Sequence, residues 1–152
     1  GLVFAGSSYD RAGMLAVQYR GARGDLSGSE RVRWTRSRGG PYVPSPLLYG
    51  DILYYHYHYK GILNRVDATT GADRPGPIRL NGLSSVFASP IGAAGRVYIT
   101  DRNGTTQVIT HEEHPKLLAQ NHLDDSFSAS PVAVGGELYL RGEKSLYCIA
   151  AK

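Results

Sequence analysis

The sequence predicts an all-β chain that forms part of a β-propeller. Its apolar stretches are four to seven residues long and are bounded by Gly, Pro, Asn or Asp, and no long amphipathic helical pattern is present. The 152 residues include 19 glycines, 8 prolines and 11 tyrosines, a composition that favours strands joined by turns. An internal repeat of about 40 residues completes the evidence, because four-stranded units with this period are typical of propeller blades.

The repeat is anchored by Ser-Pro. It reads "SPLLYGDILYY" from Ser45, "SPIGAAGRVYIT" from Ser89 and "SPVAVGGELYLR" from Ser130, so the anchors are 44 and 41 residues apart. A partial copy, "GLVFAGSS", opens the chain. Each anchored copy continues with a turn and a second apolar strand, "ILNRVD", "TTQVIT" or "SLYCIA". A further short segment, "PIRL" or "KLLAQN", ends each complete unit.

These units predict the division into blades, whose strands we name A to D from the propeller axis outward. Residues 1–39 are expected to supply B, C and D of one blade, residues 40–81 and 82–123 complete blades, and residues 124–152 A, B and C of the last blade. Fourteen strands are not a whole number of four-stranded blades, and an unclosed ring leaves open edges. We therefore expect the C-terminal portion of a ring of about seven or eight blades. A far N-terminal segment would supply the missing D strand, and the other blades of that longer chain would be its neighbours.

The bulk composition argues against several classes of function. The net charge of +4 is spread along the chain, and the basic run "RVRWTRSR" places Arg31 and Arg33 on the strand face opposite Trp34, which is typical of a solvated face. We therefore expect no nucleic-acid binding. No apolar run approaches the ~20 residues of a membrane helix, and we expect no membrane insertion. The opening residues lack the pattern of a signal peptide.

The stretch "DILYYHYHYKG", residues 51–61, has the alternation of a strand. Two faces are predicted, one with Tyr54, His56 and His58 and the other with Tyr55, Tyr57 and Tyr59. The aligned repeats place Tyr54 at a core position of strand B. Because a blade packs against a neighbour on each side, we expect both faces to be covered.

Histidines are the weak candidates for metal binding. His56 and His58 are two residues apart, a spacing that can direct two imidazoles at one zinc or copper ion. No third or fourth ligand is near in sequence, so rim histidines packed among tyrosines are the favoured interpretation, and no metal site is expected. His111 and His114 in "HEEHP" are expected in a polar turn, since Pro115 excludes a helical zinc motif.

Three other features have ordinary structural explanations. "RGD" at residues 23–25 matches an adhesion-type tripeptide, which is common by chance. "NGT" at residues 103–105 fits a glycosylation site, but Asn-Gly also predicts a hairpin turn with two positive φ angles. Cys148, the single cysteine, is expected to be buried in a strand, and it excludes an intrachain disulfide.

Two segments resemble the repeats of pyrroloquinoline-quinone (PQQ)-like β-propellers. "NRVDATTGADRPGP" is similar to their signature, in which a C strand ends in Asp-Ala-x-Thr-Gly, here residues 67–71. "SASPVAVGGELYLRGEKSLYCIA" resembles the closing blade of bacterial members of this family, which are often labelled BamB-like. The resemblance implies an exported, periplasmic protein. It also implies that a tryptophan ending strand D docks on the next blade, a position that only Trp34 fills here.

Two functions remain open. The favoured one is a non-catalytic scaffold or binding platform within an exported protein, with no cofactor expected. The alternative is a PQQ- or metal-dependent dehydrogenase whose site is completed by missing blades, and PQQ enters only through the resemblance. The family's dehydrogenases use adjacent cysteines and a carboxylate-rich calcium site, from which this sequence departs because Cys148 stands alone.

The propeller model also predicts where a site would lie. Antiparallel strands bring B–C turns and D–A loops to one face, around the channel mouth, where a protein partner or a small ligand would bind. Ser84 and Ser85 belong to this face. The binding candidates are His58, Lys60, Asp101, Arg102, Asp124, Asp125, Glu143 and Lys144. The alternative is that these are ordinary polar turn residues.

Overall fold

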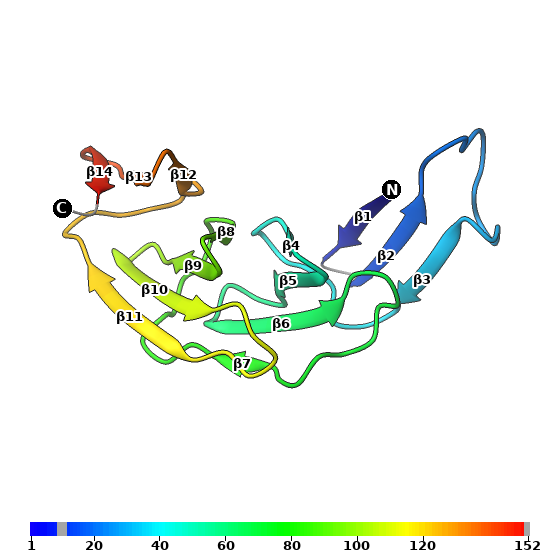
Figure 1. Cartoon of the computed structure of the whole chain (residues 1–152), viewed down its shortest axis with the longest axis horizontal. Coiled ribbons are helices and arrows are strands. Elements are labelled where there is room, and N and C mark those ends of the chain that lie inside the picture. The colour runs from blue at the N-terminus through cyan, green and yellow to red at the C-terminus, as the bar shows by residue number, and fades with distance from the viewer. Residues whose placement is uncertain (9–11, 151–152) are drawn as a thin grey trace.

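The computed structural model describes residues 1–8 and 12–150, and strands are their only regular secondary structure. The strands form four antiparallel sheets that stand side by side along an open arc (Figure 1). The first sheet contains β1 (Leu2–Ser7), β2 (Gly13–Gln18) and β3 (Val32–Arg36). The second contains β4 (Leu47–Tyr49), β5 (Ile52–His56), β6 (Ile62–Asp67) and β7 (Ile78–Arg79). The third contains β8 (Ile91–Ala93), β9 (Arg96–Thr100), β10 (Thr105–Thr110) and β11 (Leu117–His122), and the fourth β12 (Val132–Val134), β13 (Glu137–Arg141) and β14 (Leu146–Ala150).

This architecture is an incomplete β-propeller, as the sequence predicted. Strands β4, β8 and β12 line the inner side of the arc, and β7 and β11 lie on its outer side (Figure 1). Neighbouring strands pair in the order β4-β5-β6-β7 and β8-β9-β10-β11, whereas the first and last sheets each have three strands among the described residues. The edge of β14 that faces away from β13 therefore has no partner strand within the part of the chain that the structure describes.

The repeated serines link one blade to the next. The Ser45 N–H donates to the Ser89 hydroxyl at 2.9 Å, and the Ser89 N–H donates to the Ser130 hydroxyl at 3.0 Å. The following proline fixes φ and has no N–H to satisfy, so the chain enters strand A without an unpaired donor. The Ser-Pro anchor is thus an inter-blade hydrogen-bonding device, which the sequence did not reveal.

Strand β5 is packed on both faces, as predicted. All five of its residues are buried. Ile52 and Tyr54 belong to a core shared with the third sheet, whereas Leu53 and Tyr55 belong to a core shared with the first sheet. Burial of a large apolar side chain contributes about 1.5–3 kcal/mol, so these two cores hold the first three blades together.

Trp34 docks the first blade on the second. Its side chain is 8% exposed, and its Nε1–H donates to the Ala68 carbonyl oxygen at 3.0 Å. Gly71 lies against the indole with φ +71°, and a Cβ there would be 2.7 Å from Trp34 Cδ2. The Thr-Gly end of the repeat signature therefore provides the surface on which the tryptophan of the preceding blade rests.

A polar network takes the place of tryptophan at the next junction. Arg74 forms ion pairs with Asp51 at 2.5 Å, with Asp67 at 2.9 Å and with Glu113 at 3.1 Å. The Tyr54 hydroxyl and His111 Nδ1 are 2.8 Å apart and share a hydrogen bond. The "HEEHP" turn is therefore an inter-blade contact as well as a polar turn.

Three local expectations were wrong. Strand β5 ends at His56, so its alternation does not extend to His58. His56 is completely buried, not at the rim, and burial lowers its pKa to about 4. Cys148 is exposed because it lies on the outward face of the last sheet, opposite Tyr139 in the register of β13 and β14.

The Asn-Gly hairpin also differs from the expectation. Gly104 has φ +89°, but Asn103 keeps a negative φ. The turn is shaped by the Asp101 carboxylate, whose Oδ1 accepts the N–H groups of Asn103 and Thr105, each at 3.0 Å. The Asp101 side chain thus stabilises a turn in which only one of the two residues, Gly104, has a positive φ.

Candidate binding rim

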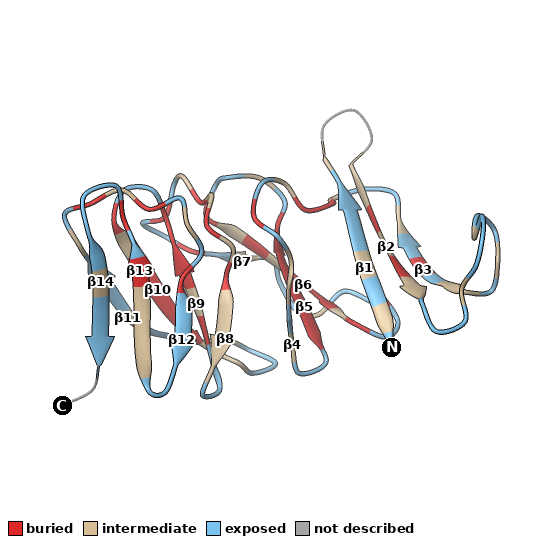
Figure 2. Cartoon of the chain, turned by 90° about the horizontal axis from the view of Figure 1, so that it is seen from above, coloured by how far each residue is buried: buried red, intermediate tan, exposed pale blue. Residues whose placement is uncertain are grey.

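The B–C turns and D–A loops meet on one edge of the arc, which we call the B–C rim. The Val86 N–H donates to the Tyr59 carbonyl at 2.8 Å, and the Arg102 N–H donates to the Ser85 carbonyl at 2.9 Å. In the last sheet, the Glu143 N–H donates to the Ser126 carbonyl at 3.0 Å. This is the upper edge in Figure 2, where buried segments alternate with exposed ones. The sequence-predicted candidates lie on these turns and loops.

Asp101 links a B–C turn of the rim to the neighbouring D–A loop. It is completely buried, and in addition to the two turn N–H groups its Oδ2 accepts the Ser84 N–H at 3.2 Å. The Asn103 amide donates to the Ser84 hydroxyl at 2.8 Å, so turn and loop are joined twice. All of these contacts occupy the carboxylate, and Asp101 has a structural role here.

Asp125 links a D–A loop of the rim to the B–C turn of the last sheet. Its Oδ1 accepts the Ser126 N–H at 2.7 Å and the Lys144 N–H at 3.1 Å, and its Oδ2 accepts the Tyr147 hydroxyl at 3.2 Å. Burial raises the pKa of this carboxyl group, but the hydrogen bonds outweigh burial and hold the pKa below its ordinary value. Asp125 is therefore ionised at neutral pH and fixes the turn that carries Lys144.

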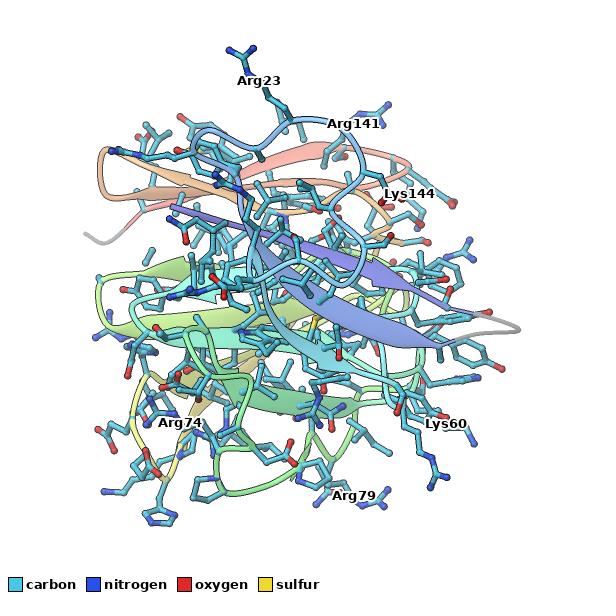
Figure 3. The ribbon with its side chains drawn as sticks, turned by 90° about the vertical axis from the view of Figure 1, so that its right-hand side faces the viewer. Arg23, Lys60, Arg74, Arg79, Arg141 and Lys144 are labelled. Carbon is cyan, nitrogen blue, oxygen red and sulfur yellow. The ribbon has the colours of Figure 1, made fainter. Side chains whose placement is uncertain are left out.

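The remaining candidates of the last sheet are exposed. The Lys144 ammonium donates to the Asp124 carbonyl at 3.1 Å and lies 3.9 Å from the Asp124 carboxylate. Glu143 is exposed beside it. Figure 3 shows Lys144 and Lys60 on the side to which the B–C turns project, and Arg74 on the opposite side.

His58 belongs to an aromatic cluster. Its ring stacks on Tyr42 with centroids 5.0 Å apart and planes 3° apart, and it contacts Tyr59 at 4.0 Å. Strand alternation does not place it with His56, and no group of three or more His, Cys, Asp or Glu residues suited to a metal ion occurs among the described residues. Stacking is thus the contact that the structure assigns to His58.

Sequence reasoning missed Phe87 and Arg79. The Arg102 guanidinium lies 5.0 Å from the centre of the Phe87 ring, a cation–π arrangement. Arg79 and Lys60 line a hollow of about 390 Å³ together with Tyr59. Phe87 occurs in the D–A loop and Arg79 on β7, and neither carries a turn signal, so only the fold brings them to the rim.

A second hollow lies between the third and fourth sheets. Its volume is about 870 Å³. The apolar lining includes Tyr98, Val108, Leu138 and Ile149. The first two blade junctions hold the buried apolar clusters found among the described residues, so this third junction is the more open one.

Comparison with solved structures agrees with the fold. BamB from Moraxella catarrhalis superposes with a TM-score of 0.72 at 16% sequence identity, over 97% of this chain and 42% of that chain. The chain therefore spans less than half the length of this structural neighbour. No family model matches the sequence. No curated protein matches it either. Among the described residues, no helix is long and apolar enough to cross a membrane.

Proposed function

We propose that the chain is part of a non-catalytic propeller that serves as a binding platform, with the B–C rim as its contact surface for a partner protein. The observation that carries the proposal is the exposure of two tyrosine side chains on one turn of a rim whose neighbouring turns are held in place by buried carboxylates. Tyr57 is 51% exposed and Tyr59 is 38% exposed. Both lie in the turn between β5 and β6, which the neighbouring D–A loop supports through the Tyr59 carbonyl.

Two physical arguments support this function. Tyrosine is enriched among residues that dominate binding energy at protein interfaces. A turn that is already ordered loses little conformational entropy when it binds, and Asp101 and Asp125 order neighbouring turns of the same rim. The propeller neighbour agrees with a scaffold role. An exported, periplasmic location follows from the family resemblance and remains part of the proposal.

Peptide display tests the location of the surface. A random peptide library would be selected on the 152-residue chain, and the enriched peptides would be tested against Tyr57→Ser and Tyr59→Ser. Tyr19→Ser is the matched control, because Tyr19 is 52% exposed and follows the C-terminal end of β2, whereas the B–C turn precedes the N-terminal end of this strand. Loss of binding with the rim variants and retention with the control is expected. No enriched peptide, or peptides that ignore the rim variants, would contradict the proposal.

A further inference from the structure

Aromatic rings form a continuous strip along the B–C rim, and they come from three different connections. Tyr42 lies between β3 and β4, His58 and Tyr59 between β5 and β6, and Phe87 between β7 and β8. Tyr59 joins them, since its ring centroid is 5.9 Å from that of Tyr42 and 6.3 Å from that of Phe87. Arg102 covers the far end of the strip over Phe87. The strip therefore crosses from the second blade toward the third.

Three exposed cations flank this strip. Lys60, Arg79 and Arg102 are exposed, and none of them takes part in the ion pairs found among the described residues. The buried Asp101 lies near Arg102 in sequence, but its oxygens accept backbone N–H groups. The positive charge of the strip is consequently available to a ligand.

Two arginines on the opposite side of the arc are neutralised by carboxylates. On the opposite side of the arc, Arg74 is surrounded by three carboxylates, and Arg36 pairs with Asp73 at 2.8 Å. In the last sheet, Lys144 has Asp124 beside it. The second and third blades thus place exposed cations that are outside the ion pairs found among the described residues next to an aromatic strip whose exposed member is Tyr59, and this juxtaposition selects a negatively charged ligand.

The hollow beside the strip provides depth. Lys60 and Arg79 lie at its walls, and residues 80–84 form much of the remaining lining. Figure 3 shows both cations at the same lower part of the molecule, extending from the ribbon. A carboxylate that enters this hollow would meet two positive charges, and the adjoining Tyr59 ring would cover an apolar neighbour.

We propose that the aromatic and basic strip binds an acidic, extended peptide segment of the partner protein. Alternate side chains of an extended peptide point in opposite directions, so carboxylates can reach Lys60, Arg79 and Arg102 while apolar side chains lie on the tyrosines. This inference rests on the proposed function of the B–C rim and adds the chemical class of the partner. Charge complementarity sets specificity and association rate, and the aromatic rings supply the apolar contact.

A defined peptide tests the inference. The probe is a fluorescein-labelled peptide of alternating Glu and Leu with one central Pro, and its partner probe has Gln at every Glu position. The 152-residue chain would be tethered sparsely on a biosensor surface, so that copies do not meet. We expect the Glu peptide to bind about tenfold more tightly than the Gln peptide, and this difference to shrink as salt is added.

Charge reversal locates the binding site. Lys60→Glu with Arg79→Glu should weaken binding of the Glu peptide by about tenfold or more. The matched control, Arg33→Glu with Arg96→Glu, changes the net charge equally at two exposed positions outside the strip, and binding should change by less than about twofold. Equal weakening by both pairs would show general charge attraction and overturn the inference.

The outcomes separate this inference from the proposed function. If the Gln peptide binds as tightly as the Glu peptide and both need Tyr59, the rim is a peptide site but not an acidic-peptide site. If neither peptide binds while display yields rim-dependent peptides of other composition, the acidic class is wrong and the platform stands. If display also yields none, both proposals fail.

Discussion

Substitution of Gly71 by alanine tests the docking of Trp34 on the second blade. Gly71 has φ +71°, and a Cβ would lie 2.7, 2.9 and 3.0 Å from three indole atoms of Trp34. The left-handed conformation costs an alanine about 1 kcal/mol, and overpacking against a ring that is itself buried adds about 1–3 kcal/mol. We therefore expect Gly71→Ala to lower the free energy of unfolding by about 2–4 kcal/mol.

Gly24→Ala is the control, because Gly24 has φ +66° with no atom within 4 Å of the added Cβ. It should cost only the conformational term of about 1 kcal/mol. Urea titration followed by the fluorescence of Trp34, the single tryptophan, measures both. In a Trp34→Leu background, followed by circular dichroism, the cost of Gly71→Ala should fall toward that of Gly24→Ala. Equal costs of the two alanines in the wild-type background would refute the docking argument.

Three further perturbations have defined outcomes. Burial lowers the pKa of His56 to about 4, so between pH 6.5 and about 4 the unfolded chain binds a proton that the folded chain does not. The free energy of unfolding should therefore fall by roughly 3 kcal/mol as pH drops through this window. In urea titrations His56→Leu should lose this pH dependence, and the control His114→Asn should keep it. Ser89→Ala removes the acceptor of the Ser45 N–H and should cost about 1 kcal/mol by thermal unfolding, while Ser128→Ala, at an exposed serine, should cost little. Asp125→Asn should lower the urea midpoint at neutral pH. The pKa of the Asp125 carboxyl group in the folded chain is below its ordinary value, so the difference from wild type should vanish in acid, where the wild-type carboxylate becomes protonated. A difference that stays unchanged in acid would contradict a role for the charge.

The repeat made the blade architecture predictable from the sequence. The positions of the strands depend on the local alternation of apolar residues and on the Gly, Pro and Asn residues that end each strand. The alternation and the strand-ending residues recur at the same distances from the Ser-Pro anchors. The docking of Trp34 on the next blade was an expectation from the resemblance to PQQ-like repeats, and the structure places its indole against Ala68 and Gly71 of that blade. Tyr54 and Tyr55 followed from period-two alternation in a strand that is covered on both sides.

The site was less predictable because it depends on contacts between distant turns. The burial of Asp101 and Asp125 follows from hydrogen bonds to loops that precede them or follow them by many residues, as with Ser84 and Lys144. Composition marked these aspartates as polar turn residues but could not show that their oxygens are occupied. Phe87 carries no local signal at all, since its importance comes from Arg102 and Tyr59 on other connections.

Histidine positions show the limit of alternation. A two-residue spacing predicts a common face only while the strand continues, and β5 ends at His56 because the chain turns there. His58 then stacks on Tyr42, which enters from the preceding D–A loop. Nothing in residues 51–61 alone contains that information.

Size-exclusion chromatography with light scattering tests the central claim, that the arc is an incomplete propeller whose last blade is open. Val132, Val134 and Leu146 are 57%, 59% and 69% exposed on the last sheet, and the outer edge of β14 is unpaired among the described residues. Open edges and exposed apolar faces tend to associate, so the wild-type chain should form species larger than 16.5 kDa. Val132→Lys with Leu146→Lys should shift the chain toward the 16.5 kDa monomer. A wild-type chain that is already a clean monomer, with a cooperative melt and a profile identical to that of the lysine variant, would contradict the account.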